Sequence, residues 1–445
     1  MTAVELTQPV VVVGLGNTGV AVAKFLSRHG IAFDCVDSRT NPPAFHEVRA
    51  LPHLRRIHTG DWEMLSEIDE GTVIVSPGLD PSLPIFARLR EAGVEVFGEI
   101  ELFARVNEKP AIGITGSNGK STVTDLTAHL ARVAGLRAIA AGNIGTPAIE
   151  LVDRDEIDLI VLELSSFQLE TTQSLSLQSA TILNICDDHL DRHRTLKAYQ
   201  DAKRRIFAHA KQAVLPVELE NFVDGLPRIL FGAGKKADYR LHEGKLWRHE
   251  DPLLSIDALK IKGQHNALNA LAAIALLETA GIRFDDAMRE ALVQYRGLRH
   301  RFEFVRTVRG IHYINDSKAT NEGAALAALA SARAQCDDVI LIAGGDAKGA
   351  LLKGLAEAIN HSCSGLVIIG RDGEKIARQV RREIPVLRAT NMNEAVMSAR
   401  ALAREGSMVL LSPACSSLDM FASYEARGDA FCAAVAQLDG DGDET

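Results

Sequence analysis

The segment VVVGLGNTG, residues 11–19, constrains the fold more than any other part of the sequence. An apolar run ends in three glycines, Gly14, Gly16 and Gly19, which are spaced as G-x-G-x-x-G. An acidic residue, Asp37, follows roughly 20 residues later, as in the strand, turn and helix of a dinucleotide-binding domain. The segment therefore predicts a parallel α/β sheet and, taken alone, favours an NAD-dependent oxidoreductase.

A second glycine-rich turn, ITGSNGKST (residues 114–122), lies between an apolar run and a helical pattern. Backbone N–H groups at such a turn point toward an anion, and Lys120 can reach terminal phosphates. The turn departs from the strict G-x-x-x-x-G-K-[ST] pattern because Ile114 occupies the first glycine position. We interpret it as an ATP-type phosphate loop, with Ser121 and Thr122 as candidate contacts to Mg²⁺ or phosphate. The alternative is a fortuitous Gly-Lys turn, but a simple dehydrogenase has no use for a second loop.

Acidic residues follow two later apolar runs. Glu163 lies within DLIVLELSSFQLE, where burying a carboxylate is costly unless it is paired or bound to a metal. Asp187, Asp188 and His189 follow ATILNIC, at the expected carboxyl end of a parallel strand, where α/β folds bind ligands. Because Mg²⁺ prefers oxygen ligands and nucleotide phosphates, it is the expected ion, although histidine is an unusual ligand for it. A salt-bridged structural acid is the alternative for Glu163.

Most of the chain alternates short apolar runs with helical patterns, which is typical of parallel α/β units. The length of 445 residues suggests about three domains. We place them at residues 1–98, 99–298 and 299–445. The tail after about Gln437 is expected to be disordered.

Composition excludes several classes of protein. The formal net charge of −9 argues against a non-specific grip on nucleic acid or anionic lipid. The sequence has no N-terminal charged-then-apolar signal and no apolar run of about 18 residues, so neither secretion nor membrane spanning is indicated. The six cysteines are scattered without metal-ligand spacing, and are interpreted as small buried side chains in a reducing cytoplasm.

The order of nine short motifs adds a resemblance to a known family. The motifs are TGSNGKST, GNIGTP, ELSSFQLE, DDHLDRH, GQHNALNA, HRFE, NDSKATN, GGDAKG and SPACSSLDMF. Together they resemble the ATP-dependent Mur ligases of peptidoglycan synthesis, from Gly14 to about Gly428. The resemblance implies an α/β protein of three consecutive domains. These are an N-terminal Rossmann-like domain for a UDP-sugar peptide, a central P-loop ATPase-type domain with a parallel sheet, and a C-terminal Rossmann-like domain for the incoming amino acid.

The resemblance also implies a reaction. ATP phosphorylates the L-alanine carboxylate of a UDP-N-acetylmuramoyl precursor, and the amine of D-glutamate attacks the acyl phosphate. The tetrahedral intermediate collapses to an amide and releases phosphate, so the oxygen that was phosphorylated becomes the leaving group. The implied protein is a cytoplasmic monomer that uses ATP and two Mg²⁺ ions, with small-molecule substrates and neither nucleic acid nor membrane insertion. No residue reports the handedness of the glutamate, so a ligase for L-glutamate stays an alternative.

Residues of the ATP and metal sites are carried over by position. The implied phosphate loop comprises Gly116, Ser117, Asn118, Gly119, Lys120, Ser121 and Thr122. Asn266 and Asn269 match positions near the adenine, and Arg301, Asp316 and Lys318 match groups that hold ATP once the C-terminal domain closes. The implied metal ligands are Ser121, Glu163, His189 and Lys203, and the implied catalytic residues are Lys120, Asn143, His189 and Lys203. Lys203 matches the lysine that these ligases carbamylate for a second magnesium, although the residues alone make it one base among several on a solvated helix.

The substrate residues follow from the same resemblance. Gly14, Gly16, Asn17 and Thr18 are expected near the diphosphate of the UDP group, Asp37, Ser38 and Arg39 near its uracil and ribose, and Ser76, Pro77 and Gly78 beside them. Thr320, Lys348, Ser417 and Tyr424 match the glutamate site. We expect SPACSSLDMF to open a helix, with Ser417 either bound to a carboxylate or acting as an ordinary N-cap. Tyr424 and Ala347 depart from the phenylalanine and glycine common in relatives.

Alternative functions fit the sequence less well. The D-N-P-R signature of the diaminopimelate-adding ligase is absent, and residues 1–98 argue against a folylpolyglutamate synthetase, which lacks a comparable N-terminal domain. An oxidoreductase would leave the second loop unexplained, and no His–acid or Tyr–Lys arrangement supports it. A non-catalytic binding module would not be expected to keep Lys120, Glu163, His189 and Lys203 together.

Overall fold

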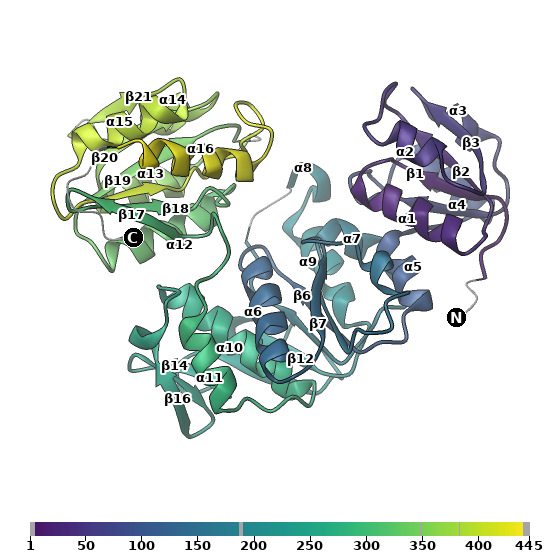
Figure 1. The fold of residues 1–445 in the computed structure, drawn as a ribbon, viewed down its shortest axis with the longest axis horizontal. Helices are drawn as coiled ribbons and strands as arrows, with labels where there is room; N and C mark the ends of the chain where they lie inside the picture. Colours follow the sequence, from purple (N-terminus) through teal and green to yellow (C-terminus); the bar gives the residue numbers. More distant parts are fainter. Residues whose placement is uncertain (1–4, 187–189, 348, 382, 439–445) are drawn as a thin grey trace. The chain divides into compact units, whose positions relative to one another are not determined.

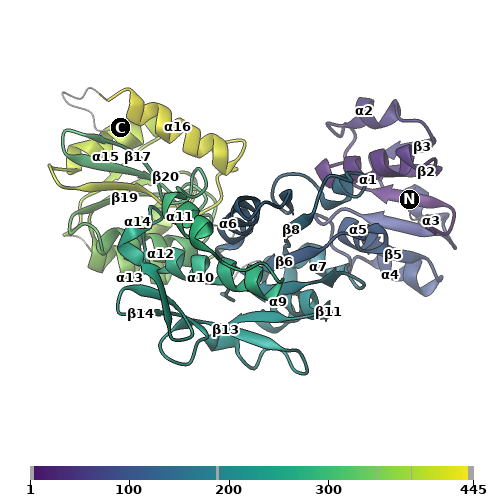
Figure 2. The ribbon, with the colours of Figure 1, turned by 60° about the horizontal axis from the view of Figure 1, so that its bottom comes forward.

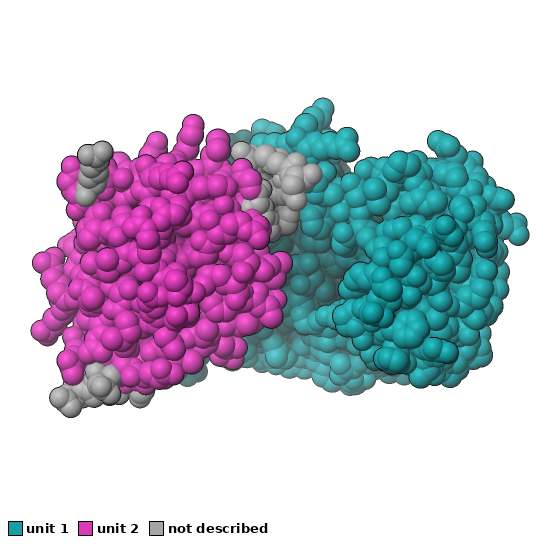
Figure 3. Space-filling view, turned by 90° about the horizontal axis from the view of Figure 1, so that it is seen from above, with its two compact units in different colours: residues 1–185, 192–258, 268–294 teal, residues 186–191, 259–267, 295–445 magenta. Residues whose placement is uncertain are grey.

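The computed structural model describes residues 5–186, 190–347, 349–381 and 383–438, and contains three large sheets, each with its own helices (Figure 1). The chain divides into two compact units (Figure 3). Unit 1 holds residues 1–185, 192–258 and 268–294, and unit 2 holds residues 186–191, 259–267 and 295–445. The first two sheets lie in unit 1 and the third lies in unit 2.

The first sheet is entirely parallel, in the order β3-β2-β1-β4-β5. Its strands are β1 (Val10–Val13), β2 (Phe33–Asp37), β3 (Leu54–Thr59), β4 (Thr72–Val75) and β5 (Glu95–Gly98). The helices of this part are α1 (Asn17–Arg28), α2 (Phe45–Arg49), α3 (Glu63–Ser66), α4 (Pro84–Glu91) and α5 (Glu99–Val106). Because β2 and β4 flank β1, the strand order reverses at β1, and the first glycine loop lies at the carboxyl end of that strand, where open α/β sheets bind ligands.

The second sheet has nine strands in the order β16-β15-β14-β13-β12-β10-β6-β8-β7. They are β6 (Ala111–Thr115), β7 (Ala138–Gly142), β8 (Leu159–Glu163), β10 (Ser179–Ile182), β12 (Ala213–Pro216), β13 (Arg228–Ala233), β14 (Tyr239–His242), β15 (Lys245–Arg248) and β16 (Asp251–Ser255). A separate two-strand pair joins β9 (Ser176–Leu177) to β11 (His209–Ala210). Strands from β7 to β14 are parallel, whereas β15 and β16 form antiparallel pairs at the edge.

Helices α6 (Lys120–Val133), α7 (Ser166–Glu170), α8 (Leu190–His193), α9 (Leu196–Arg204), α10 (Gln264–Thr279) and α11 (Asp286–Gln294) accompany this sheet (Figures 1 and 2). Short 3₁₀ turns are η1 (Ala148–Leu151), η2 (Arg205–Phe207), η3 (Val217–Leu219) and η4 (Ile256–Ala258). Helix α10 is apolar on all sides, and its residues from Ala270 to Leu277 are all buried.

The third sheet has the order β17-β18-β22-β19-β20-β21, and only β17 is antiparallel to its neighbour. The strands are β17 (Glu303–Val308), β18 (Ile311–Asn315), β19 (Val339–Gly344), β20 (Cys363–Ile369), β21 (Val386–Arg388) and β22 (Met408–Leu411). The helices are α12 (Glu322–Arg333), α13 (Lys353–Ser362), α14 (Gly373–Ala377), α15 (Met392–Leu402) and α16 (Tyr424–Ala436).

Continuous apolar runs form the central strands because both faces of each sheet are covered. In β19, Leu341 packs with residues of α12 and α13, whereas Ile340 and Ile342 pack on the opposite face with α15 and α16. Helices α15 and α16 lie side by side over that second face (Figures 1 and 2). In β1, Val10 and Val12 likewise join one core while Val11 and Val13 join another. No described helix combines the length and apolarity needed to cross a membrane.

One local prediction is wrong. SPACSSLDMF does not open a helix directly: α16 begins at Tyr424, and its N-cap is Ser423, whose side chain accepts a hydrogen bond from Ala426 N. After β22 the chain turns through Ala414, whose φ is +59°, and Ser416 pairs with Asp346 in an isolated bridge. This backbone pairing holds the segment in an irregular turn, so Ser417 is not a helix N-cap.

Candidate active site

The second glycine loop joins β6 to α6, as the sequence predicts. Gly119 is the N-cap of α6 with a φ of +84°, and a Cβ added there would lie 2.7 Å from Asn269 Oδ1. Gly116 has a φ of +149°, and a Cβ there would lie 3.1 Å from Leu183 Cβ. Both positions therefore require glycine, and the loop keeps its backbone close to the start of α6. Asn269 of α10 is brought against this loop, and Asn266 lies one helical turn before it.

A side-chain amide that the sequence interpretation missed holds the loop. Asn184 Oδ1 accepts from Asn118 N at 2.8 Å, and Asn184 Nδ2 donates to Asn118 O at 3.0 Å. The backbone carbonyl of Asn184 also accepts from Ser117 N at 3.0 Å. The signal was an asparagine directly after the apolar run ATIL, at the carboxyl end of β10 next to β6. The amide fixes the loop without adding a charge to it.

Two lysines converge on one carbonyl of the loop. Lys120 Nζ donates to Gly116 O at 2.8 Å and to Ser117 O at 2.9 Å. Lys203 Nζ, on α9, donates to the same Gly116 O at 2.9 Å and to Thr115 Oγ1 at 3.4 Å. Lys203 is only 1% exposed, and its Nζ lies 4.4 Å from the centre of the Tyr199 ring. Because two like charges meet at one point, this corner of the loop favours an anion.

Glu163 lies at the end of β8, in register with Ile114 of β6 and Gly142 of β7. It is 3% exposed, and its Oε1 accepts from Asn143 Nδ2 at 2.7 Å. Its Oε2 is buried without a hydrogen-bond partner in the described part of the chain. An orphaned, buried carboxylate oxygen beside a phosphate loop suits a hard cation such as Mg²⁺.

The other candidate metal ligands are only partly included in the described residues. Ser121 and Thr122 are both buried in the first turn of α6. His189, together with Asp187 and Asp188, lies outside the described residues. Within the described ranges no three His, Cys, Asp or Glu side chains cluster as metal ligands. The oxygen donors at Glu163 and Ser121 nevertheless fit the coordination that Mg²⁺ prefers.

The first glycine loop is braced differently. Ser76 Oγ donates to Gly14 O at 2.8 Å, and Leu15 N donates to Asp37 Oδ2 at 2.7 Å. Arg39 donates to Asp37 through its backbone N, its Nε and its Nη2, at 2.9, 2.9 and 2.6 Å. Burial would raise the pKa of Asp37, but the hydrogen bonds from Arg39 and Leu15 outweigh it and hold that pKa below its usual range.

The start of α1 is open to a ligand. Its N-cap is Gly16, and no side chain caps the helix; Gly16 and Asn17 are exposed and Thr18 is half-buried. Ser38 and Arg39 are exposed beside Asp37, and Pro77 and Gly78 follow Ser76 at the end of β4. The structure thus brings the predicted substrate residues of the first sheet to the carboxyl ends of β1, β2 and β4.

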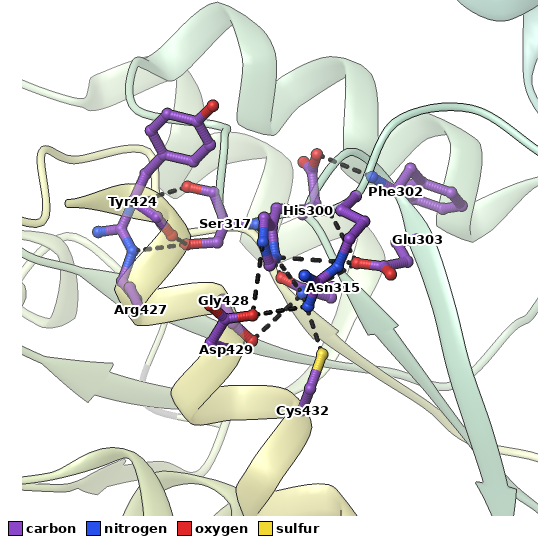
Figure 4. A network of polar contacts seen from close by, with 12 residues as sticks. His300, Phe302, Glu303, Asn315, Ser317, Tyr424, Arg427, Gly428, Asp429 and Cys432 are labelled. Atoms are coloured by element: carbon purple, nitrogen blue, oxygen red, sulfur yellow. Dashed lines mark hydrogen bonds and ion pairs between the residues drawn. The ribbon is translucent and has the colours of Figure 1, made fainter.

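In unit 2, polar contacts connect the segment before β17 to the residues after β18 and to α16 (Figure 4). Asp316 accepts from Phe302 N at 3.1 Å and from Ser412 Oγ at 2.8 Å. Burial raises the pKa of Asp316 to about 7, although Arg301 and Arg427 act to lower it. Arg301 and Asp316, which the resemblance assigns to ATP together, therefore lie close enough for their charges to interact.

Two further network residues, Asn315 and Arg427, were not predicted. Asn315, fully buried, places its Nδ2 within 2.9 Å of His300 Nδ1 and 3.3 Å of Gly428 O (Figure 4). Arg427 is 1% exposed and donates to Ser317 O at 2.8 Å and to Cys415 O at 3.1 Å. An arginine among the small residues of EARGDAFCAAVA was the available signal for Arg427.

Two of the predicted amino-acid residues, Thr320 and Ser417, lie on loops that Arg427 connects, and Tyr424 begins α16. Lys318 Nζ lies 3.8 Å from the centre of the Tyr424 ring, and Ser317 Oγ donates to Tyr424 O at 2.8 Å. Thr320 follows Lys318 and is half-buried. Ser417 is buried, and its carbonyl accepts from Met420 N and Phe421 N. Lys348 lies outside the described residues.

Three family models match the chain in order. They are described as Mur ligase MurD-like N-terminal domain (residues 8–98), Mur ligase middle domain (residues 114–277) and Mur ligase glutamate ligase domain (residues 300–415).

Individual relatives agree with these models. Proteins named UDP-N-acetylmuramoylalanine–D-glutamate ligase are 45% identical in Pseudomonas fluorescens and 43% identical in Pseudomonas aeruginosa, each over 96% of this chain and 98% of the relative. Among solved structures, Thermotoga maritima UDP-N-acetylmuramate-alanine ligase MurC has a TM-score of 0.62 at 20% identity, over 97% of this chain and 99% of that chain. Thermotoga maritima MurF in complex with ADP also has a TM-score of 0.62, at 15% identity, over 96% and 95%.

The matches confirm the predicted three-part α/β architecture and set the oxidoreductase alternative aside. A phosphate loop with two lysines, an orphaned acidic oxygen and an independent glycine loop are combined in one chain of this architecture. The chain belongs to the Mur ligase family.

Proposed function

We propose that this protein is the ATP-dependent ligase that adds D-glutamate to UDP-N-acetylmuramoyl-L-alanine in peptidoglycan synthesis. The observation that carries the proposal is the likeness to ligases of that name, at 42–45% identity over 96–97% of the chain. The reaction forms an amide bond and yields ADP and phosphate. Since ATP and the UDP-linked precursor are cytoplasmic compounds, the proposed location is the cytoplasm, and the proposed form is a monomer.

Three parts of the chain divide the work in this proposal. Residues 1–98 hold the UDP group, residues 99–298 hold ATP and the reacting carboxylate, and residues 299–445 hold D-glutamate. The uncapped N-terminus of α1 supports the first assignment, because its N–H groups and dipole favour a diphosphate. The two lysines that donate to the second loop, Lys120 and Lys203, support the second assignment.

The chain's own residues then act mainly by position and charge. Lys120 leaves its carbonyl partners and binds the terminal phosphates of ATP, while Asn118 and Gly119 keep the loop backbone in place. Asn143, now bonded to Glu163, lies where the activated carboxylate arrives. Glu163, Ser121 and His189 would hold Mg²⁺, which neutralises the charge that develops on the transferred phosphoryl group. The acyl phosphate so formed is attacked by the amine of glutamate, and phosphate leaves.

Lys203 is the proposed site of carbamylation. Its neutral amine would attack carbon dioxide, form an N–C bond and release a proton, so that a cation becomes an anion. Burial supports this, because a buried ammonium is costly to maintain, and the contacts of its Nζ include a carbonyl, a hydroxyl and an aromatic face. The carbamate would supply oxygen ligands for a second Mg²⁺.

The glutamate site rests on Thr320, Lys348, Ser417 and Tyr424. Arg427 supports this grouping, because it joins the loop that carries Thr320 to the loop that carries Ser417. Lys318, which we propose contacts ATP, lies next to Tyr424 of this site.

Phosphate release tests the proposal. Purified protein is given ATP, Mg²⁺ and UDP-N-acetylmuramoyl-L-alanine, with D-glutamate, L-glutamate, L-alanine and diaminopimelate supplied in turn. We expect release with D-glutamate alone. Release with L-glutamate instead would overturn the stereochemical assignment. If none of the four amino acids stimulated phosphate release, the proposed function would be overturned.

A further inference from the structure

The proposed substrate must reach from one sheet of unit 1 to the other. Its UDP group would lie at the carboxyl ends of β1 and β4, and its L-alanine carboxylate would lie at the second glycine loop. Catalysis therefore depends on how accurately these two places are held relative to each other. The inference below rests on the proposed function in this respect.

Arg192, on α8, joins the two parts directly. Its Nη2 donates to Leu79 O at 2.8 Å and to Glu170 Oε2 at 3.0 Å. Leu79 directly follows the turn Ser76–Gly78 assigned to the UDP group, whereas Glu170 ends α7, the helix that follows β8. The guanidinium also stacks over the Phe167 ring at 4.8 Å. One planar group thus holds a backbone carbonyl of the first part and a carboxylate of the second.

The contacts continue from Glu170 to the phosphate loop. Glu170 Oε1 lies 3.3 Å from His193 Nδ1, and the ring centres of His193 and Tyr199 are 5.2 Å apart. Tyr199 Oη in turn lies 3.1 Å from Ser117 Oγ. A continuous set of contacts, which we call the Arg192 link, therefore runs from Leu79 to Ser117.

The Arg192 link is well shielded from water. The side chain of Arg192 is 12% exposed and that of His193 is 1% exposed. Burial raises the pKa of Glu170, and Arg192 opposes this effect. Beside the link, a hollow of about 350 Å³ that is open to solvent is lined by residues of both parts, among them Ser82, Arg90, Glu170 and Arg205. Hydrogen bonds from Arg192 therefore contribute to the spacing of the two parts at this point.

We propose that Arg192 is a positioning residue, which fixes the substrate turn at residues 76–80 against the nucleotide loop through Glu170, His193 and Tyr199. Arg192 does not contact the reacting atoms in this role. It keeps the UDP end of the precursor at the distance from which its L-alanine carboxylate can reach the second loop.

The test separates positioning from simple binding by comparing two ligands. UDP alone occupies only the first part, whereas UDP-N-acetylmuramoyl-L-alanine engages both parts. For Arg192→Met, we expect the Kd for the full precursor to rise about 10- to 100-fold. Once the UDP group is bound, the L-alanine carboxylate would meet the second loop at a lower effective concentration, because the two parts are no longer held at a fixed distance. The Kd for UDP and the Kd for ADP should each change less than about twofold.

Arg28→Met is the matched control. Arg28 also crosses between the two parts, with Nη2 at 3.2 Å from Asp153 Oδ2, but neither residue belongs to the substrate turn. Arg28→Met should leave the Kd for the precursor within about twofold. Arg192→Lys, which keeps the charge but cannot hold both partners with one planar group, should weaken the precursor to an intermediate degree and covers the case in which the methionine variant does not fold.

Each other outcome overturns the proposal. Equal loss of UDP affinity would make Arg192 part of the UDP pocket, and unchanged precursor affinity in both Arg192 variants would remove its role. Loss of the same size in Arg28→Met would reduce the effect to general stability of the seam. These binding measurements need no turnover, so a wild-type protein that failed to release phosphate would contradict the proposed function separately.

Discussion

The two glycine loops of unit 1 have the same framework and different charge. Each follows a buried parallel strand and leads into a helix, α1 in the first case and α6 in the second. In each, glycines allow the backbone to pack where a Cβ would collide: Gly19 against Gly14 O, and Gly119 against Asn269. Framework alone therefore cannot distinguish a site that only holds a nucleotide from one that transfers its phosphate.

The groups that hold each loop make the distinction. The first loop is tied to a carboxylate, Asp37, whose charge Arg39 neutralises. The second is tied to a neutral amide, Asn184, and two lysines lie on its Gly116 carbonyl. Because phosphoryl transfer concentrates negative charge, the lysines at the second loop fit the stabilisation of the transition state that we propose for it. The first is suited to hold a diphosphate that does not react.

The largest predicted effect is that of removing the phosphate-loop lysine. Lys120→Met should lower kcat for phosphate release about 10³-fold, because the substitution removes the positive charge that stabilises the transferred phosphoryl group. The Kd for UDP-N-acetylmuramoyl-L-alanine should stay within about threefold, since the first loop is intact. Lys24→Met, which changes an exposed lysine of α1 paired with Glu47, is the control and should keep wild-type turnover. Turnover retained in Lys120→Met would show that the second loop is not the reactive one.

A steric prediction tests the first loop. A Cβ at Gly19 would lie 1.8 Å from Gly14 O, whereas at Gly16 nothing lies within 4 Å. Gly19→Ala should therefore reduce the free energy of unfolding by about 3 kcal/mol and weaken UDP binding, while Gly16→Ala changes stability by less than about 0.5 kcal/mol. Denaturant unfolding and UDP titration measure both. Equal stability of the two variants would contradict the tight packing of this turn.

Replacing the neutral Asn184 amide, which holds the second loop, by a carboxylate tests whether charge distinguishes the two loops. Asn184→Asp gives the second loop a carboxylate like that of the first, and should raise the Kd for ATP about 10-fold more than Asn184→Ala does. The excess should shrink as ionic strength rises, because it arises from charge rather than from the lost hydrogen bonds. A larger effect of the alanine variant would mean that geometry, not charge, sets ATP affinity.

The smallest effect concerns Asp37. The pKa of this carboxyl is lowered in the folded protein, so its stabilisation is present above the pKa of the unfolded chain and disappears as pH falls through the folded pKa. Asp37→Asn should reduce the free energy of unfolding by about 1 kcal/mol at pH 7, with a smaller difference below about pH 4. Unfolding curves across this range are the measurement, and a difference that grew toward acid pH would reverse the sign of the argument.

Sequence patterns anticipated the buried, regular parts of the fold best. Strands such as β8 and β19 are continuous apolar runs because both faces are covered, so they were predictable. Strands β3 (LRRIHT) and β15 (KLWR) were not predicted, since partial exposure mixes polar residues into short segments. The glycine loops were predictable because positive φ angles and close packing demand glycine.

Contacts between distant segments were harder to predict. Asn184 and Arg192 act through partners far away in sequence, and neither has a spacing that distinguishes it from an ordinary loop residue. The helix expected after SPAC was wrong, because the pairing of Ser416 with Asp346 outweighs local preference. His189 and Lys348 stay predictions, outside the described residues.

We propose that the two glycine loops of unit 1 bind two different nucleotides at once. Equilibrium dialysis with labelled UDP and labelled ADP measures this directly. We expect one UDP and one ADP to bind per chain, with the Kd for UDP unchanged by saturating ADP and no binding of NAD. Competition between UDP and ADP for one site, or displacement of UDP by NAD, would contradict it.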